Sequence, residues 1–257
     1  MIDILDPVPM IIHGFFDLRY HTRDEDFYVS EEILYERMKI MSVKVGLKYI
    51  DLWQESMEDE ILAYEQEEQP QEQIVFYGPS YFTRWSKKFG VKPMRDCLLG
   101  ASGAACVVNR GFGSSTAEHQ LYYYPRTVRP LAPKVLVYAS FANNMAFGYT
   151  DEEGWELAQR VIAWAKTDFP GIRIYIEGAH PTRDEDAERR ARKQAYNETL
   201  KAFAEANEDV FFLDLYDHPE FLRKDIFVED GVHLNPLGYE YYAAFYRDAL
   251  KDELAKF

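Results

Sequence analysis

The chain has 257 residues, enough for one sizeable α/β domain or for a domain with an extension. A hydrophobic content of 47% supports a buried core, and a formal charge of −15 argues against a nucleic-acid or anionic-membrane surface, which would need clustered Lys and Arg. No apolar run reaches transmembrane length, and we expect no signal peptide. With only two cysteines, Cys97 and Cys106, we expect reduced thiols in a cytoplasmic protein without a metal site.

The amino-terminal part of the chain is the least informative. Residues 1–29 mix short apolar runs with charge, and they indicate no particular fold. A helix is predicted from Ser30, where acidic residues fill the first turn and Ile33, Leu34 and Met38 form one face. We treat residues 1–55 as an extension of undetermined role.

From residue 56 the pattern becomes regular. A helix is predicted over Ser56–Tyr64, and the polar stretch 66–73 that follows it is a loop. Five short runs rich in Val, Ile, Phe and Tyr then have the composition of buried parallel strands. These runs are Ile74–Tyr77, Ala105–Asn109, Val135–Ala139, Arg173–Glu177 and Val210–Leu213.

Predicted helices alternate with these strands. Thr150 and Glu153 have the spacing of a capping box, and an apolar helical face follows them. The stretch 184–206 is a charged helix, and Asn235-Pro236 begins the last helix with a cap residue and a proline at the first helical position. Residues 56–257 therefore predict a three-layer α/β/α sandwich with a five-stranded parallel sheet.

The stretch from Ile74 to Trp85 combines a buried strand, a turn at Gly78-Pro79 and the start of a helix. Ser80 directly follows the turn, so it would lie at the carboxyl end of a strand, where open α/β sheets form their sites. The free N–H groups and positive dipole end of a helix start suit an oxyanion. The alternative is that Ser80 only caps the helix, since serine is a common N-cap residue.

Three other polar stretches would be brought to the same edge of the sheet. They are residues 109–116, residues 140–148, and the segment from Asp230 to His233 just before the last helix. A serine hydroxyl needs a base to become a nucleophile, and the base needs a group that orients it. His233 and Asp230, three residues apart, can supply both.

Donors for a tetrahedral oxyanion are also present in these stretches. The backbone N–H groups around Gly111 and Gly113 can form an anion-binding nest, and Asn143 can add a side-chain amide. The two glycines also fit a dinucleotide-binding loop, but Thr116 stands where the third glycine of that fingerprint should be. Asn143-Asn144 fits a simple turn as well, so the functional interpretation depends on the conjunction of the four motifs.

Together and in this order, the motifs resemble the conserved blocks of the SGNH (GDSL-like) hydrolase family. The resemblance covers roughly residues 56–257. The matching segments of the first, second, third and fifth blocks are Phe76–Ser80 with Trp85, Val107–Thr116, Tyr138–Gly148 and Asp230–Asn235.

The resemblance implies a flavodoxin-like sheet, no cofactor, and a catalytic triad. Ser80 is implied as the nucleophile, His233 as its base and Asp230 as the support of that base. Asn143 is implied as a donor to the oxyanion. The implied activity is the hydrolysis of a carboxylic ester.

The chain departs from the family pattern at three places. Pro79 stands where the family usually has Asp or Ser, and Asn144 replaces the usual acid in a third block that carries one extra residue. Ser114 falls at the position of the family's oxyanion glycine. Its backbone N–H can still serve, but a positive φ there would cost roughly 1–3 kcal/mol, and Gly113 is the alternative donor.

Four residues beside the motifs are candidates for lining a pocket for an acyl group or a sugar. They are Tyr81, Phe141, Phe147 and His180. The aromatic residues fit the core equally well, and His180 fits a surface turn.

We therefore predict a cytoplasmic serine esterase that acts on a small ester, with a short acyl group such as acetyl and with a carbohydrate as the first alcohol to test. Two alternatives stay open, namely a ligand-binding protein on the same fold that has lost catalysis and an acyltransferase that uses the same serine. The expected partner is a small-molecule ester, with no nucleic acid and no membrane. The extension over residues 1–55 is a candidate for contact with a second subunit.

Overall fold

The computed structural model of the chain describes residues 53–257, Ile50 and four two-residue strands closer to the amino terminus. The chain divides into two compact units, Met1–Lys44 and Val45–Phe257. The first contains two antiparallel pairs, β1 (Ile11–Ile12) with β2 (Phe15–Phe16) and β3 (His21–Thr22) with β4 (Glu25–Asp26). The helix predicted from Ser30 lies outside the described residues.

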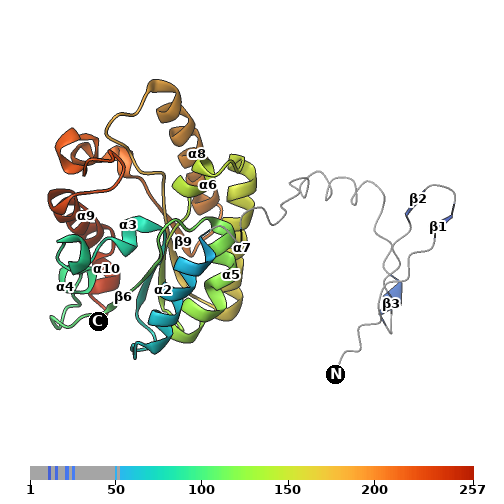
Figure 1. The fold of residues 1–257 in the computed structure, drawn as a ribbon. Coiled ribbons are helices and arrows are strands. Elements are labelled where there is room, and N and C mark those ends of the chain that lie inside the picture. The colour runs from blue at the N-terminus through green and yellow to red at the C-terminus, as the bar shows by residue number, and fades with distance from the viewer. Residues whose placement is uncertain (1–10, 13–14, 17–20, 23–24, 27–49, 51–52) are drawn as a thin grey trace. The chain divides into compact units, whose positions relative to one another are not determined.

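A five-stranded parallel sheet forms the centre of the second unit (Figure 1). In spatial order the strands are β6 (Val107–Gly111), β5 (Ile74–Gly78), β7 (Val135–Ala139), β8 (Arg173–Glu177) and β9 (Val210–Leu213). The last three have the predicted bounds. The strand β6 begins two residues later than predicted, because Ala105 forms an antiparallel bridge with Leu99 outside the sheet.

Helices cover both faces of the sheet, which confirms the predicted three-layer sandwich (Figure 1). One face carries α2 (Gln54–Gln66), α5 (Ala117–Thr127), α7 (Asp151–Asp168) and α8 (Ala187–Glu205). The other carries α3 (Ser80–Thr83), α4 (Met94–Cys97), α9 (Pro236–Ala249) and α10 (Lys251–Leu254). The remaining helical segments are α6 (Ala142–Ala146) and the 3₁₀ turns η1 (Lys87–Phe89), η2 (Arg129–Leu131), η3 (Leu215–Asp217), η4 (Pro219–Leu222) and η5 (Lys224–Ile226).

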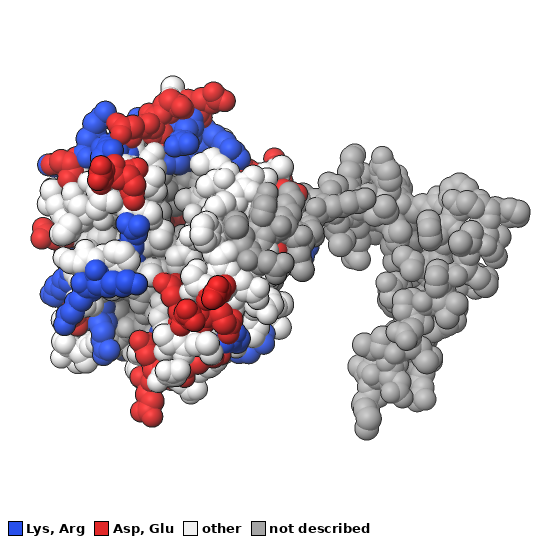
Figure 2. All heavy atoms as spheres, in the orientation of Figure 1, with Lys and Arg blue, Asp and Glu red and all other residues white. Residues whose placement is uncertain are grey.

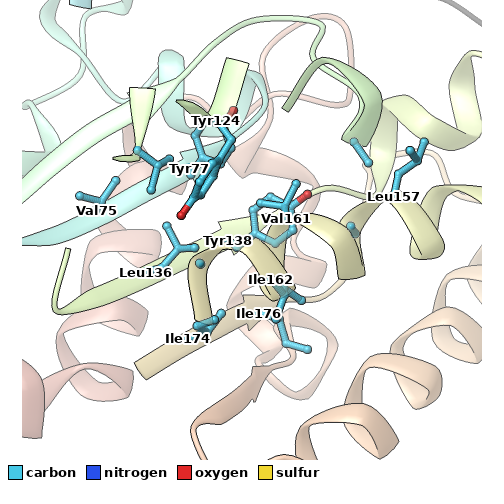
Figure 3. Close-up of a cluster of buried hydrophobic side chains, with 14 of the residues drawn as sticks. Val75, Tyr77, Tyr124, Leu136, Tyr138, Leu157, Val161, Ile162, Ile174 and Ile176 are labelled. Carbon is cyan, nitrogen blue, oxygen red and sulfur yellow. The ribbon is translucent and has the colours of Figure 1, made fainter. Parts of the chain in front are cut away.

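Two hydrophobic clusters fill the spaces between the sheet and the helices. On one face, Val75 and Tyr77 of β5 belong to a cluster with Leu136 of β7 and residues of α7 (Figure 3). On the other face, Ile74 and Phe76 belong to a cluster with residues of α9. Because alternate residues of a strand point to opposite faces, a strand covered on both sides is apolar throughout, and all of β5 is buried.

Side-chain caps fix where several helices begin. The predicted capping box is present before α7, with Thr150 Oγ1 accepting from the Glu153 N–H (3.1 Å) and the Glu153 carboxylate accepting from the Thr150 N–H (3.0 Å). Asn235 caps α9 by accepting from the Gly238 N–H (3.0 Å). A further box at Thr116 and His119 begins α5. This box was not predicted, because the residue three positions after the cap is a histidine rather than Glu or Gln.

None of the helices between residues 53 and 257 is long and apolar enough to cross a membrane.

Candidate active site

Ser80, His233 and Asp230 form a hydrogen-bonded series at the carboxyl edge of the sheet. Ser80 Oγ lies 2.8 Å from His233 Nε2, and His233 Nδ1 lies 2.7 Å from Asp230 Oδ2. Ser80 is the first residue of α3, and Pro79 occupies the cap position before it. The N-cap interpretation of Ser80 therefore does not hold, because its hydroxyl bonds an imidazole from the far end of the chain.

A tight loop fixes Asp230 relative to His233. Asp230 Oδ1 accepts hydrogen bonds from the backbone N–H groups of Val232 (2.8 Å) and His233 (2.9 Å). Gly231 between them has a φ of 70°, a conformation that favours glycine. One carboxylate oxygen thus holds the loop and the other holds the imidazole.

The electrostatics of this pair define its proton positions. Burial raises the pKa of Asp230, but hydrogen bonds from the His233 ring and from two backbone N–H groups outweigh burial and lower that pKa to about 2. Burial lowers the pKa of His233 below its ordinary 6.5, against the hydrogen bond to Asp230, which raises it. Near neutral pH an ionised Asp230 can only accept, so the neutral ring carries its proton on Nδ1 and leaves Nε2 to accept from Ser80.

The end of β6 holds the short helix that carries Ser80. Asn109 Nδ2 donates to the backbone oxygen of Phe82 (2.7 Å), and Asn109 Oδ1 accepts from the Gly111 N–H (2.9 Å). A Cβ at Gly111 would lie only 2.7 Å from the backbone nitrogen of Thr83, so α3 can approach β6 this closely only beside a glycine.

A cavity of about 290 Å³ opens beside Ser80 and His233. Asn143, in the first turn of α6, lines it. Asn143 Nδ2 donates to the backbone oxygen of Ser115 (2.9 Å), which fixes the orientation of the amide. Its second N–H has no acceptor among the described residues, so it is available to a ligand in the cavity.

The loop after β6 contains the two backbone N–H groups predicted as donors, and they differ in whether they are already hydrogen-bonded. Gly113 lines the cavity, but its N–H donates to Glu60 Oε2 (2.9 Å) and is thereby occupied. Ser114 also lines the cavity, and no described group accepts a hydrogen bond from its N–H. Its φ of 57° is the strained conformation considered above, at a cost of roughly 1–3 kcal/mol.

Asn144, which replaces the usual acid of the family, stabilises the fold and does not face the cavity. Its side chain is buried, with Oδ1 accepting from the Ala117 N–H (2.8 Å) and Nδ2 donating to the backbone oxygen of Ser140. It therefore ties α6 to the first turn of α5 and does not line the cavity.

Of the four residues predicted to line the pocket, only Tyr81 does so. Phe141 is buried in the core, with its ring centroid 4.1 Å from that of Tyr196 in α8. Phe147, at the end of α6, is not part of the cavity wall. His180 is buried, and its ring stacks on that of Tyr81 at 3.6 Å, so it lies behind the wall rather than in it.

Six residues of the cavity wall were not singled out from the sequence, namely Glu60, Thr83, Arg84, Phe89, Ala142 and Val232. Arg84 Nη1 lies 3.8 Å from Asp230 Oδ2, and its guanidinium lies over the Phe89 ring at 5.2 Å. Their positions depend on tertiary contacts. The only sequence signals were that Arg84 follows the Ser80 motif closely and that Glu60 lies in the helix leading into the first strand.

Within the described residues, no group of three or more His, Cys, Asp or Glu side chains is placed to hold a metal ion.

Comparison of the sequence with known protein families gave a match. Residues 77–241 match the model of the GDSL-like lipase/acylhydrolase family. A search of curated proteins found no match.

Solved structures with the same fold include two lipases or acylhydrolases and one esterase. One is a GDSL-like lipase from Bacteroides thetaiotaomicron, 18% identical, with a TM-score of 0.57 over 85% of this chain and 98% of that one. Another is a lipase/acylhydrolase from Enterococcus faecalis, 19% identical, with a TM-score of 0.57 over 71% and 96%. The third is an acetylxylan esterase from Geobacillus stearothermophilus, 15% identical, with a TM-score of 0.57 over 72% and 97%.

Proposed function

Because this chain belongs to the GDSL-like lipase/acylhydrolase family, we propose that it is a serine esterase that hydrolyses a small carboxylic ester at Ser80. The observation that carries the proposal is the hydrogen-bonded series from Ser80 through His233 to Asp230, with links of 2.8 Å and 2.7 Å beside a cavity. A serine hydroxyl becomes a nucleophile when a positioned base removes its proton, and this arrangement provides such a base.

The reaction begins when Ser80 Oγ attacks the ester carbonyl carbon and His233 Nε2 takes the hydroxyl proton. Asp230 holds the ring and stabilises the imidazolium that forms. The negative charge on the carbonyl oxygen is met by the free N–H of the Asn143 amide and by the backbone N–H of Ser114. The N–H of Ser80, at the first position of α3 and without an acceptor inside that helix, is placed to add a third donor.

Collapse of the tetrahedral intermediate breaks the bond to the alcohol, which leaves with the proton held by His233. The acyl group then remains on Ser80 as an ester. A water molecule gives its proton to His233, attacks the acyl carbonyl carbon through the same oxyanion donors, and releases the acid. Ser80 recovers its proton from His233 in this last step.

The acyl group that we propose is acetyl or another short chain, and the alcohol that we would test first is a carbohydrate. Tyr81 forms part of the wall beside Ser80 in a cavity of about 290 Å³, which leaves limited room on the acyl side. One structure of the same fold is an acetylxylan esterase, which supports the choice of an acetylated sugar as a first substrate.

The test is the substitution Ser80→Ala, with Ser102→Ala as the matched control on an exposed turn. We expect Ser80→Ala to lower kcat for 4-nitrophenyl acetate by about 10⁴–10⁶-fold and to abolish labelling by a fluorophosphonate, while circular dichroism stays unchanged. Retained turnover in Ser80→Ala would remove Ser80 from the chemistry. Failure of the wild-type protein to react with the fluorophosphonate would favour the ligand-binding alternative.

An acyltransferase is the second candidate, because a second cavity of about 320 Å³ adjoins the first and offers space for an acceptor alcohol. Product analysis with excess glycerol separates the two reactions. A hydrolase releases mostly free acid, whereas a transferase yields the glycerol ester.

A further inference from the structure

The second cavity adjoins the catalytic one. Glu60, Thr83 and Phe89 belong to the walls of both cavities, so a substrate whose acyl group lies at Ser80 and which passes Phe89 would enter the second space. With a volume of about 320 Å³, that space is as large as the first. It is therefore placed to receive the alcohol part of an ester.

The segment that forms one wall of this second cavity is strongly basic. The twelve residues from Arg84 to Arg95 contain five cations and no Asp or Glu, in a chain whose formal charge is −15. The five are Arg84, Lys87, Lys88, Lys92 and Arg95. Figure 2 shows Lys and Arg side chains gathered over the part of the molecule where Figure 1 places α3 and α4, with Asp and Glu side chains over α2.

Most of these cations lack the carboxylate partner that most other Lys and Arg side chains of the described residues have. Arg126, Arg129, Arg173 and Arg192, for example, form close pairs with carboxylates from other parts of the chain. Lys87, Lys88, Lys92 and Arg95, in contrast, have no carboxylate within 4.0 Å among the described residues. No other stretch of the described chain leaves four successive cations without such a partner. The wall of the second cavity also carries two carboxylates: Glu67 pairs with Arg110 (3.1 Å), and Glu60 accepts from the Gly113 N–H (2.9 Å). The four cations outnumber these two carboxylates, and an excess of positive charge beside a cavity attracts anions.

Two of the four cations, Lys88 and Arg95, belong to the wall of the second cavity itself. Between the two cavities lies the Phe89 ring, which is 37% exposed and has the Lys88 ammonium 5.7 Å from its centroid. An exposed ring can pack against the apolar face of a sugar, while a guanidinium and an ammonium can bind an oxyanion on the same molecule.

We propose that the second cavity binds the alcohol part of the ester and that this alcohol carries an oxyanion, either a carboxylate or a phosphate, held by Lys88 and Arg95. The proposal rests on the proposed esterase function and adds to it a substrate class, the acylated acidic or phosphorylated sugar.

The experiment compares three esters that carry acetyl on the same hydroxyl group. The alcohols are methyl glucoside, methyl glucuronoside and methyl glucoside 6-phosphate. We expect kcat/KM for at least one anionic ester to exceed that of the neutral ester by about five- to tenfold, mainly through KM. The uronate and phosphate arms show which oxyanion is preferred. Added salt should reduce this ratio, because it screens exposed charges.

Substitution then assigns the preference to the two cations. In Lys88→Gln/Arg95→Gln we expect the ratio of anionic to neutral kcat/KM to fall to about 2 or less. The control Lys166→Gln/Lys251→Gln neutralises two cations outside both cavity walls and should leave the ratio unchanged. Equal kcat/KM for all three esters in the wild type, or a preference that survives Lys88→Gln/Arg95→Gln, would overturn the proposal.

Parallel turnover of 4-nitrophenyl acetate keeps this outcome separate from the fate of the esterase proposal. If the wild-type protein hydrolyses the aryl ester without preferring an anionic sugar ester, only the anionic subsite is refuted. If it hydrolyses none of the four esters, the esterase function itself fails.

Discussion

The second unit of the chain contains two histidine–carboxylate pairs with the same sequence spacing, and their surroundings differ. In the pair of Asp230 and His233, the carboxylate bonds Nδ1, and Nε2 faces the Ser80 hydroxyl at the edge of a cavity. In the pair of Glu177 and His180, the carboxylate lies 2.5 Å from Nε2, and neither residue reaches the cavity.

The second pair is enclosed by protein groups on several sides. Glu177 is the last residue of β8, and its other oxygen accepts hydrogen bonds from the hydroxyl groups of Tyr242 and Tyr246 in α9. The His180 ring stacks on Tyr81. Buried polar groups are tolerated when their hydrogen bonds are made, and here both Glu177 oxygens and His180 Nε2 have protein partners.

The comparison shows what turns such a pair into a general base. Equal spacing and a short contact to a carboxylate are common to both pairs. What differs is the group at the ring nitrogen that does not bond the carboxylate. Only His233 presents that nitrogen to a hydroxyl, and only His233 does so beside a space that a substrate can enter.

The largest expected effect comes from replacing the two histidines in turn. His233→Asn should lower kcat for 4-nitrophenyl acetate by about 10⁴–10⁶-fold and change the free energy of unfolding by less than about 1 kcal/mol. His180→Asn should do the reverse. It should keep activity within about tenfold, and it should lower the free energy of unfolding by about 1–3 kcal/mol, because Glu177 loses a donor and Tyr81 loses a stacking partner.

Steady-state kinetics and urea unfolding on both variants measure the contrast. A loss of activity in His180→Asn as large as that in His233→Asn would contradict this prediction and would mean that the buried pair takes part in the reaction.

The adjacent residues Asn143 and Asn144 differ in the same way as the two histidines, and we expect a smaller effect on kcat from their replacement. Asn143, which lines the cavity, has one N–H without an acceptor among the described residues, whereas both ends of the adjacent Asn144 amide bond the protein backbone. Asn143→Ala should therefore lower kcat by about 10²–10³-fold, and it should cost less stability than Asn144→Ala, because the protein loses only one hydrogen bond, to the Ser115 oxygen. Asn144→Ala should lower the free energy of unfolding by about 1–3 kcal/mol, because it leaves the buried Ala117 N–H and Ser140 oxygen unpaired. A fall in kcat of less than threefold in Asn143→Ala would reassign that residue to loop structure.

The features that could be predicted from the sequence are those set by local patterns. The strands were recognisable because burial on both faces requires continuous apolar runs. The start of α7 was recognisable from the three-residue spacing of its capping box, and that of α9 from a cap residue followed by proline. Ser80 and His233 could be paired because the topology places the ends of parallel strands at one edge.

What could not be predicted depends on contacts between distant segments. The occupation of the Gly113 N–H requires Glu60 from a helix 53 residues earlier in the chain, and no spacing rule indicates it. Phe141 and His180 lie next to functional motifs in sequence, but the packing of α8 and α9 turns their side chains into the protein interior. Adjacency to a motif thus predicts the position of a backbone segment better than the direction of a side chain.

The smallest predicted effect concerns the pH below which His233 becomes protonated and activity is lost. His233 must be neutral to accept the Ser80 proton, and burial lowers its pKa below 6.5. A base with a lowered pKa stays unprotonated to more acidic pH, so kcat/KM should reach half its plateau below pH 6.5.

The positive charge of Arg84 contributes to the lowering of the His233 pKa. In Arg84→Gln the imidazole should hold its proton to higher pH, and the acid limb of kcat/KM should move upward. Profiles from about pH 5 to 8 at constant ionic strength measure the shift, with Arg192→Gln, whose partner is Asp151, as the control. An acid limb that stays in place in Arg84→Gln would show that the Arg84 charge does not reach the His233 ring.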